Sequence, residues 1–272
     1  MRKPMRFKRK KKRVSFLKLR SFWYATGVLF FLTFLFYAVV FSSWLEIKEV
    51  QVEGAQEVKK EHILAALGEK LWWNWFGIPT NSILLFDGTG AGELLSYKFP
   101  LLRAVFVKRS FPQTIVVSVE ERVQVGTWCV SLKAGEESLC FALDKEGIAF
   151  KEVEAGEGYT LFSSKEASQV ALGKESLNLQ LLSTLLDFRE AFLSAGEPMH
   201  VILAAFEIGR AGQVEGVTQE GWKIRLDTEE SMEWQQTKLQ LVLEQKIPPE
   251  KRGELKYIDL RFGDQAYIKY QD

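Results

Sequence analysis

Residues 99–128 have the sequence FPLLRAVFVKRSFPQTIVVSVEERVQVGTW, and this stretch decides the fold of the middle of the chain. It contains two apolar runs, Leu102–Arg109 and Thr114–Glu120, which are rich in the β-branched and aromatic side chains that favour strands. Pro112 lies between them in Ser110–Gln113, a short segment that predicts a tight turn. We therefore expect two consecutive strands here, joined by that turn.

Toward the N-terminus, three further segments predict the rest of a small module. Glu46–Val52 alternates in polarity like a strand, and Val58–Leu67 has the apolar spacing of a short amphipathic helix with Gly68 as its stop. Glu93–Phe99 predicts a second short helix, which Pro100 ends. The order strand–helix–helix–strand–strand predicts a small α+β layer with its helices on one face of the sheet.

Two segments between these elements are predicted as loops. The first contains LWWNWFGIP, in which Trp72, Trp73, Trp75 and Phe76 form an unusually aromatic cluster. These side chains either contact the membrane surface or a partner's transmembrane segment, or they cover the core of the small module. The second loop, Asp87–Gly92, is rich in glycine but lacks the Gly-Lys-Ser/Thr ending of a phosphate-binding loop.

A membrane segment precedes the module. Phe22–Trp44 is a run of twenty-three residues without a charged side chain. A helix of this length measures about 34 Å, enough for a hydrocarbon core of about 30 Å. Trp23, Tyr24 and Trp44 lie at its ends, where amphipathic rings favour the membrane interface. The apolar region of a cleaved signal peptide is only about 7–15 residues long, so we expect an uncleaved transmembrane helix.

The charges of the chain are segregated. Of 36 Lys/Arg and 35 Asp/Glu in 272 residues, eleven basic and no acidic residues lie in 1–20, which leaves a formal charge of −10 for the remainder. By the positive-inside rule, residues 1–21 lie in the cytoplasm and the rest lies outside it. A basic tail in this position sets topology and attracts anionic membrane lipid, so we expect no nucleic acid as a partner. Its few apolar residues predict that it is disordered.

The C-terminal half predicts a mixed, β-rich domain with two helices. Residues 177–195 and Glu229–Lys246 have helical apolar spacing, and Asp144–Gly147 is a strong turn signal. The apolar faces of the two helices comprise Leu181, Leu185, Phe188 and Phe192, then Met232, Leu239, Val242 and Leu243. The predicted strands are Val123–Val130, Ser138–Leu143, His200–Ile208, Trp222–Leu226, Lys256–Phe262 and Gln265–Tyr270.

Three groups of residues, in order along the chain, resemble the FtsQ/DivIB family of bacterial cell division proteins, whose members carry a POTRA module. The family pattern V-x-R-x-x-P-x-T, followed by V-x-E-R, is matched by Val107, Arg109, Pro112, Thr114, Val119, Glu121 and Arg122. Two later patterns are matched by Asp144, Gly147 and Phe150, and by Tyr257, Asp259, Leu260 and Arg261. The chain departs from the family at Gln124 and Gly126, where Pro and Ala are usual.

The resemblance implies an α+β chain of four parts. These are a cytoplasmic tail at 1–21, a transmembrane helix at 22–44, a βααββ POTRA module at 45–121 and an FtsQ-type β-rich domain at 122–272. It also implies a single-pass divisome protein of the cytoplasmic membrane that acts in septum formation and is concentrated at the division site. Its partners would be FtsB/FtsL-like single-span proteins, with a septal peptidoglycan synthase as a further candidate.

The last predicted strand, Gln265–Tyr270, bears most directly on mechanism. A terminal strand at a sheet edge has unpaired N–H and C=O groups to which another chain can add a strand. The resemblance implies that a partner is received there, in contact with Phe262, Ala266, Tyr267, Ile268, Lys269 and Tyr270. Tyr257, Asp259 and Arg261 would build the supporting strand. The alternative is a short tail that simply packs, with Lys269 discouraging aggregation.

Cys129 and Cys140 are the only cysteines. A two-residue turn at Ala134–Gly135 would place them directly opposite each other in a hairpin, close enough for a disulfide. An exterior compartment permits that oxidation, and the alternative is two small buried apolar residues.

Composition and motifs argue against catalysis. With two cysteines and only His62 and His200, the chain cannot assemble a His-rich or four-cysteine zinc site. No nucleophile or acid–base set emerges, so we expect neither an enzyme nor a cofactor. Two alternatives stay open, an anchored extracytoplasmic enzyme and a POTRA protein of polypeptide secretion or outer-membrane assembly. The sequence predicts neither repeated POTRA units nor a C-terminal β-barrel, and this counts against the second alternative.

Overall fold

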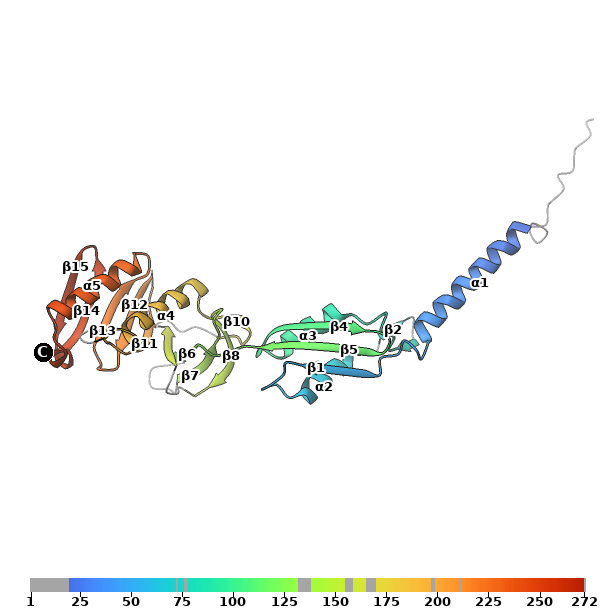
Figure 1. Cartoon of the computed structure of the whole chain (residues 1–272), viewed down its shortest axis with the longest axis horizontal. Helices are drawn as coiled ribbons and strands as arrows, with labels where there is room; N and C mark the ends of the chain where they lie inside the picture. The colour runs from blue at the N-terminus through green and yellow to red at the C-terminus, as the bar shows by residue number, and fades with distance from the viewer. Residues whose placement is uncertain are drawn as a thin grey trace, which may run out of the picture. The chain divides into compact units, whose positions relative to one another are not determined.

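The computed structural model describes residues 20–271 except 72, 76–77, 132–137, 155–158, 165–169, 197–198 and 211. The chain forms two compact units, whose helices and strands are labelled in Figure 1. The first contains the residues up to 53 together with 59–92 and 106–118. The second contains 54–58, 93–105 and everything from 119 onward.

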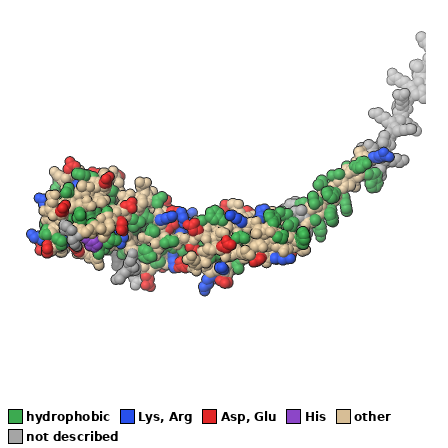
Figure 2. Space-filling view, in the orientation of Figure 1, with side chains coloured by type: hydrophobic (Ala, Val, Ile, Leu, Met, Phe, Trp, Pro, Cys, Tyr) green, Lys and Arg blue, Asp and Glu red, His purple; other side chains and the backbone are tan. Residues whose placement is uncertain are grey.

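The first element, α1 (Arg20–Phe41), is an apolar helix whose large side chains are exposed, as the row of hydrophobic side chains in Figure 2 shows. Among the described residues it alone is long and apolar enough to cross a membrane. It ends three residues before Trp44, the predicted end, because the chain turns there and the Trp44 N–H donates to Ser42 Oγ at 3.2 Å. Residues 1–19 of the predicted basic tail lie outside the described residues, which begin at Arg20.

A three-stranded sheet follows, with the strand order β1-β5-β4. Its strands are β1 (Glu49–Glu53), β4 (Leu102–Ser110) and β5 (Thr114–Glu121), which confirms the two strands and the turn predicted from residues 99–128. β1 runs parallel to β5. The buried apolar side chains of this region are Val52, Ile63, Leu67, Ile83, Phe86, Leu95, Leu102, Ile115 and Val117.

The two helices of this region are longer than predicted. α2 (Lys60–Leu71) continues through Gly68, so the prediction of a stop there is wrong. One glycine costs a helix only about 1 kcal/mol, which the burial of apolar residues on the preceding turns outweighs. α3 (Gly88–Lys98) begins inside the glycine-rich segment predicted as a loop, because Asp87 Oδ1 accepts a hydrogen bond from the Gly90 N–H at 3.0 Å and caps the helix.

The aromatic segment is also more regular than predicted. β2 (Trp73–Trp75) and β3 (Ile78–Thr80) pair antiparallel as a two-stranded hairpin, so the prediction of a loop is wrong for these residues. Trp72 and Phe76 lie outside the described residues.

The C-terminal part is a ten-stranded sheet in the order β10-β8-β7-β6-β9-β11-β12-β13-β14-β15. Two helices share its core, α4 (Leu179–Leu193) and α5 (Met232–Gln245), which Asn178 and Ser231 cap with their side-chain oxygens. The largest fully buried core side chains are Trp222, Phe162, Phe192 and Phe206. The strands are β6 (Gly126–Ser131), β7 (Ser138–Leu143), β8 (Ile148–Val153), β9 (Thr160–Ser164), β10 (Lys174–Glu175), β11 (Leu203–Ile208), β12 (Gln213–Thr218), β13 (Lys223–Asp227), β14 (Leu255–Phe262) and β15 (Gln265–Tyr270).

The helix faces match the prediction with two shifts. In α4 the buried positions are Leu182, Leu185, Phe188 and Phe192, so Leu182 replaces the predicted Leu181. In α5 they are Gln235, Lys238, Leu239 and Leu243, which brings two polar side chains into the interior.

Candidate functional site

β15 lies at one edge of the ten-stranded sheet, as predicted for the last strand. Among the strands of the described residues it pairs, antiparallel, with β14 alone, through registers such as Tyr257↔Lys269 and Asp259↔Tyr267. A strand of six residues with one paired side leaves its other side available for main-chain hydrogen bonds to an added strand.

The side chains of β15 alternate between the core and the exposed face. Ala266 and Ile268 are half-buried and pack against the core. Tyr267 and Lys269 are exposed, and they share a face with their β14 partners Asp259 and Tyr257. Of the predicted contact set, therefore, Ala266 and Ile268 can offer a partner main chain only.

An aromatic patch stands at the turn end of the hairpin. Phe262 and Tyr267, which are 53% and 52% exposed, form an edge-to-face pair with ring centroids 5.2 Å apart. The Tyr267 hydroxyl donates to Gln265 Oε1 at 2.6 Å, and the Arg261 guanidinium lies 5.8 Å from the Phe262 ring centroid. This patch offers apolar surface with a cation beside it, a combination that suits partner recognition.

Asp259 is a buried carboxylate that pairs with arginines of β13 and β14. Its carboxylate accepts two hydrogen bonds from the Arg261 guanidinium, at 2.8 and 2.6 Å, and lies 3.7 Å from Arg225. Burial opposes ionisation of Asp259, but the Arg261 hydrogen bonds and the two positive charges outweigh it and hold the pKa of Asp259 below its usual value. The predicted supporting residues Asp259 and Arg261 are thus joined directly.

Arg225 extends this arrangement to the neighbouring strands, and the sequence analysis missed it. Its guanidinium stacks 3.9 Å from the Tyr257 ring centroid and its Nε donates to Glu215 at 3.1 Å. Lys223 pairs with Glu215 at 3.3 Å and with Glu207 at 2.9 Å. The sequence did contain a signal for Arg225. Polar residues alternate with apolar ones along β12 and β13, and the polar positions mark the less buried face of each strand.

A shallow hollow of about 250 Å³ adjoins this charged face. Its lining includes Gly209, Gln213, Glu215, Arg225 and Arg261. The two guanidinium groups that line it are already paired with Glu215 and Asp259, so the hollow offers polar surface rather than an enclosed small-molecule site.

Lys238 supports the hairpin from the α5 side. Its ammonium group is buried, donates to the carbonyl of Leu260, and donates to that of Gly263 at 2.6 Å. The lysine thereby fixes the turn between β14 and β15. The sequence carried a signal for it, since Lys238 follows Gln235 by three residues and precedes Val242 by four on one helix face.

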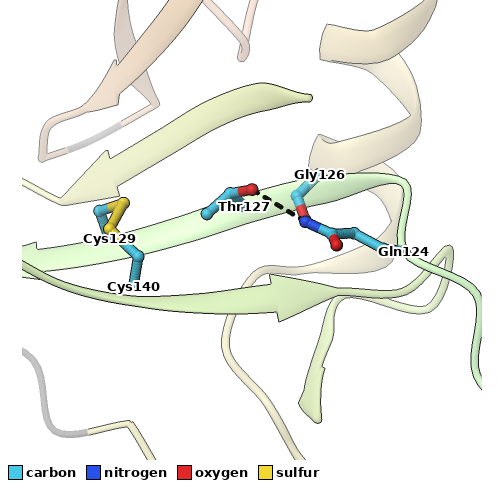
Figure 3. The surroundings of a disulfide bond; sticks show 5 residues. All are labelled: Gln124, Gly126, Thr127, Cys129 and Cys140. Carbon is cyan, nitrogen blue, oxygen red and sulfur yellow. Dashed lines mark hydrogen bonds between the residues drawn. A yellow bond between two sulfur atoms is a disulfide. The ribbon is translucent and has the colours of Figure 1, made fainter. Parts of the chain in front are cut away.

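The two cysteines form a disulfide between the paired strands β6 and β7, as Figure 3 shows. Cys129 and Cys140 are directly opposed, with Cα atoms 4.1 Å apart. The two-residue turn expected at Ala134–Gly135 lies outside the described residues.

In the motif between Val107 and Arg122, three charged residues bind to other segments of the chain. The Arg109 guanidinium donates to the Phe86 carbonyl at 2.6 Å. Arg122 pairs with Asp144 and, at 3.2 Å, with Glu146.

The third of these motif residues, Glu121, accepts hydrogen bonds from the backbone N–H groups of Gln56, Glu57 and Val58 at 2.9–3.0 Å. Burial opposes ionisation of Glu121, but these three donors outweigh it, so the pKa of Glu121 is lowered.

Among the described residues, no group of three or more His, Cys, Asp or Glu side chains could hold a metal ion. His62 is exposed on α2, and His200 is half-buried before β11.

Comparison with known protein families identifies one domain of the chain. No curated protein matches it. A family model described as "POTRA domain, FtsQ-type" matches residues 45–122, which include β1, α2, α3, β4 and β5. The chain therefore contains a POTRA domain of the FtsQ type, preceded by one apolar helix that is long enough to span a membrane.

Proposed function

We propose that the protein is a bitopic scaffold of bacterial septum formation that catalyses no reaction. The observation that carries this proposal is the FtsQ-type POTRA domain directly behind a single apolar helix. The positive-inside rule orients the chain with its basic N-terminus in the cytoplasm, so that the residues following α1 lie on the other side of the membrane.

The scaffold acts by receiving another membrane division protein, of the FtsB/FtsL kind, along β15. Main-chain hydrogen bonds to the free side of β15 supply affinity. The exposed Phe262, Tyr267 and Tyr270 supply contact area, while the ion pairs of Arg261 and Arg225 with Asp259 keep β14 in place behind β15.

The first experiment is imaging of an N-terminal fluorescent fusion of the full chain in growing cells of the source organism. A ring at midcell in constricting cells supports the division role. An even membrane distribution that ignores the septum would overturn it and favour secretion or outer-membrane assembly.

The second experiment tests the binding strand with point variants. Deletion of β15 is a poor test because it also removes Ala266 and Ile268 from the core. We expect Tyr267→Ala to weaken binding of the FtsB/FtsL-like partner at least tenfold, which corresponds to about 1.4 kcal/mol. The matched control is Tyr159→Ala, which removes a tyrosine of similar exposure (46%) outside β15.

Hydrogen exchange separates strand addition from side-chain docking. We expect the partner to slow amide exchange in residues 265–270, because their outward N–H groups become hydrogen-bonded. Unchanged exchange there, together with equal affinity of the Tyr267 and Tyr159 variants, would exclude β15 as the binding strand.

A further inference from the structure

The segment that leaves the membrane helix is joined to two other parts of the first unit. Leu45 accepts a hydrogen bond from the Ile83 N–H at 2.7 Å, and the Ile47 N–H donates to Asn81 at 3.0 Å. On its other side, Gln113 Nε2 donates to the Ser43 carbonyl at 2.9 Å. The chain therefore leaves α1 between the end of β3 and the β4–β5 turn.

This connectivity places both parts close to the membrane if α1 spans it. Ser43 follows Phe41, the last residue of α1, by only two residues, which extend over at most about 7 Å. Gln113, which contacts Ser43, and Asn81, which contacts Ile47, therefore lie within a few residues' reach of the helix end.

The same end of the unit displays aromatic residues. Trp44 is 80% exposed, and Phe111, in the β4–β5 turn, is 58% exposed. Tryptophan and other aromatic residues with one polar side concentrate at membrane interfaces, where one end of the ring system is apolar and the other is hydrated.

Trp44 and Phe111 are not part of the core of the small module. Ile63, Leu67, Ile83, Leu95 and Ile115 are fully buried among its described side chains. Trp44 and Phe111 instead lie at the surface beside the end of the membrane helix, where the bilayer interface is within their reach.

We propose that Trp44 and Phe111 form a membrane-side surface that docks on the headgroup region of the outer leaflet. The bilayer is the occupant because the surface continues directly from α1, which lies in that bilayer. The exposed cations Lys48, Lys108 and Arg109 are balanced only in part by Glu46 and Glu49, so the lipid chosen for the test is zwitterionic. With such lipid, docking depends on the aromatic residues and is insensitive to salt.

The test uses the full chain in lipid nanodiscs without any partner protein. A fluorophore is attached at Ser110→Cys, next to Phe111, or, as the control, at Glu53→Cys, an exposed site at the opposite end of β1, about 13 Å from Glu49. Nitroxide on the lipid headgroups quenches fluorophores that lie close to the surface. We expect quenching at position 110 to exceed that at 53 at least twofold, in both low and high salt.

A second variant tests the aromatic contribution. With the label at 110, the changes Trp44→Ala and Phe111→Ala should together reduce quenching by at least half while thermal unfolding is unchanged. If this variant unfolds, the comparison of positions 110 and 53 in the otherwise unchanged chain still decides. Equal quenching at the two positions, or quenching at 110 that appears only after a partner's membrane segment is added, would overturn the proposal.

Discussion

Glu121 shows how one carboxylate can order a neighbouring segment. It accepts three consecutive backbone N–H groups just before α2, so its removal leaves those donors without their acceptor. We expect Glu121→Ala to lower the free energy of unfolding by about 1–2 kcal/mol, measured by urea denaturation. Glu120→Ala is the matched control, because Glu120 forms only an exposed pair with Arg103 and should change stability by less than about 0.5 kcal/mol.

The contribution of Glu121 depends on pH. Its pKa in the folded chain is lowered, so its stabilising effect is fully present above the pKa of the unfolded chain, about 4.3. It is lost as pH falls through the lower folded-state pKa. The stability difference between the parent chain and Glu121→Gln should therefore shrink below about pH 4; a difference that grows on acidification would contradict this assignment.

Asp259 is the corresponding residue of the candidate binding site. Asp259→Asn removes the charge that pairs with Arg261 and Arg225, and breaking a buried ion pair costs about 3 kcal/mol. Asp264→Asn, at an exposed neighbouring position, serves as the control in the same chemical unfolding series. Equal stability of the two variants would show that Asp259 does not organise β14.

Sequence motifs identified both of these residues. Glu121 and Asp259 lie in recognisable motifs, but their partners could be found only in three dimensions. Glu121 binds a segment more than sixty residues earlier, and Arg225 joins Asp259 from a strand that is not adjacent in sequence. The spacing of apolar residues in one sequence indicates local helices and strands, but it contains no information on such long-range pairings.

At the element scale, Lys238 connects α5 to the hairpin of β14 and β15. Lys238→Met leaves the carbonyls of Leu260 and Gly263 without their charged donor, a loss of about 2 kcal/mol. Hydrogen exchange should accelerate most in residues 260–270. The control is Lys246→Met at the exposed end of α5; if both variants affect exchange equally, Lys238 has no specific role in the turn.

The disulfide fastens the hairpin of β6 and β7. It closes a segment with a sequence separation of 11 residues, for which the loop-entropy relation predicts a stabilisation of about 3 kcal/mol. The double variant Cys129→Ala, Cys140→Ala should therefore unfold at a lower urea concentration than the oxidised parent chain. Thiol titration of the denatured parent provides the check, because two free thiols would exclude the bridge.

Element boundaries were predictable where local chemistry is distinctive. β7 and β15 have the predicted bounds, and β4 and β5 differ by one residue, because alternation and turn residues define them. α3 was predicted too short because glycines conceal a helix start that Asp87 caps. β12, with a glycine in its centre, escaped prediction since its burial depends on its neighbours in the sheet.

At the scale of the whole molecule, the α1 helix should hold the protein in the membrane. Its 22 residues extend about 33 Å, close to the thickness of the hydrocarbon core. We expect the full chain to stay with membranes after an alkaline carbonate wash and to be released when residues 20–41 are deleted. Release of the intact chain by the wash would show that it is only peripherally attached.

The strand order of the ten-stranded sheet could not be predicted from sequence patterns. The order of parts along the chain was predictable from the apolar run, the motifs and the last strand. The insertion of β9 between β6 and β11 was not, because parallel neighbours separated by many residues leave no local signal.

The two ends of that sheet differ in a way that limits stoichiometry. β10 has two residues, whereas β15 has six, so the described sheet offers a usable template at one end only. An added strand occupies that end and completes it. Two copies of this chain that paired through β15 would form a closed, symmetric dimer rather than a growing filament, and such a dimer and the partner complex would exclude each other.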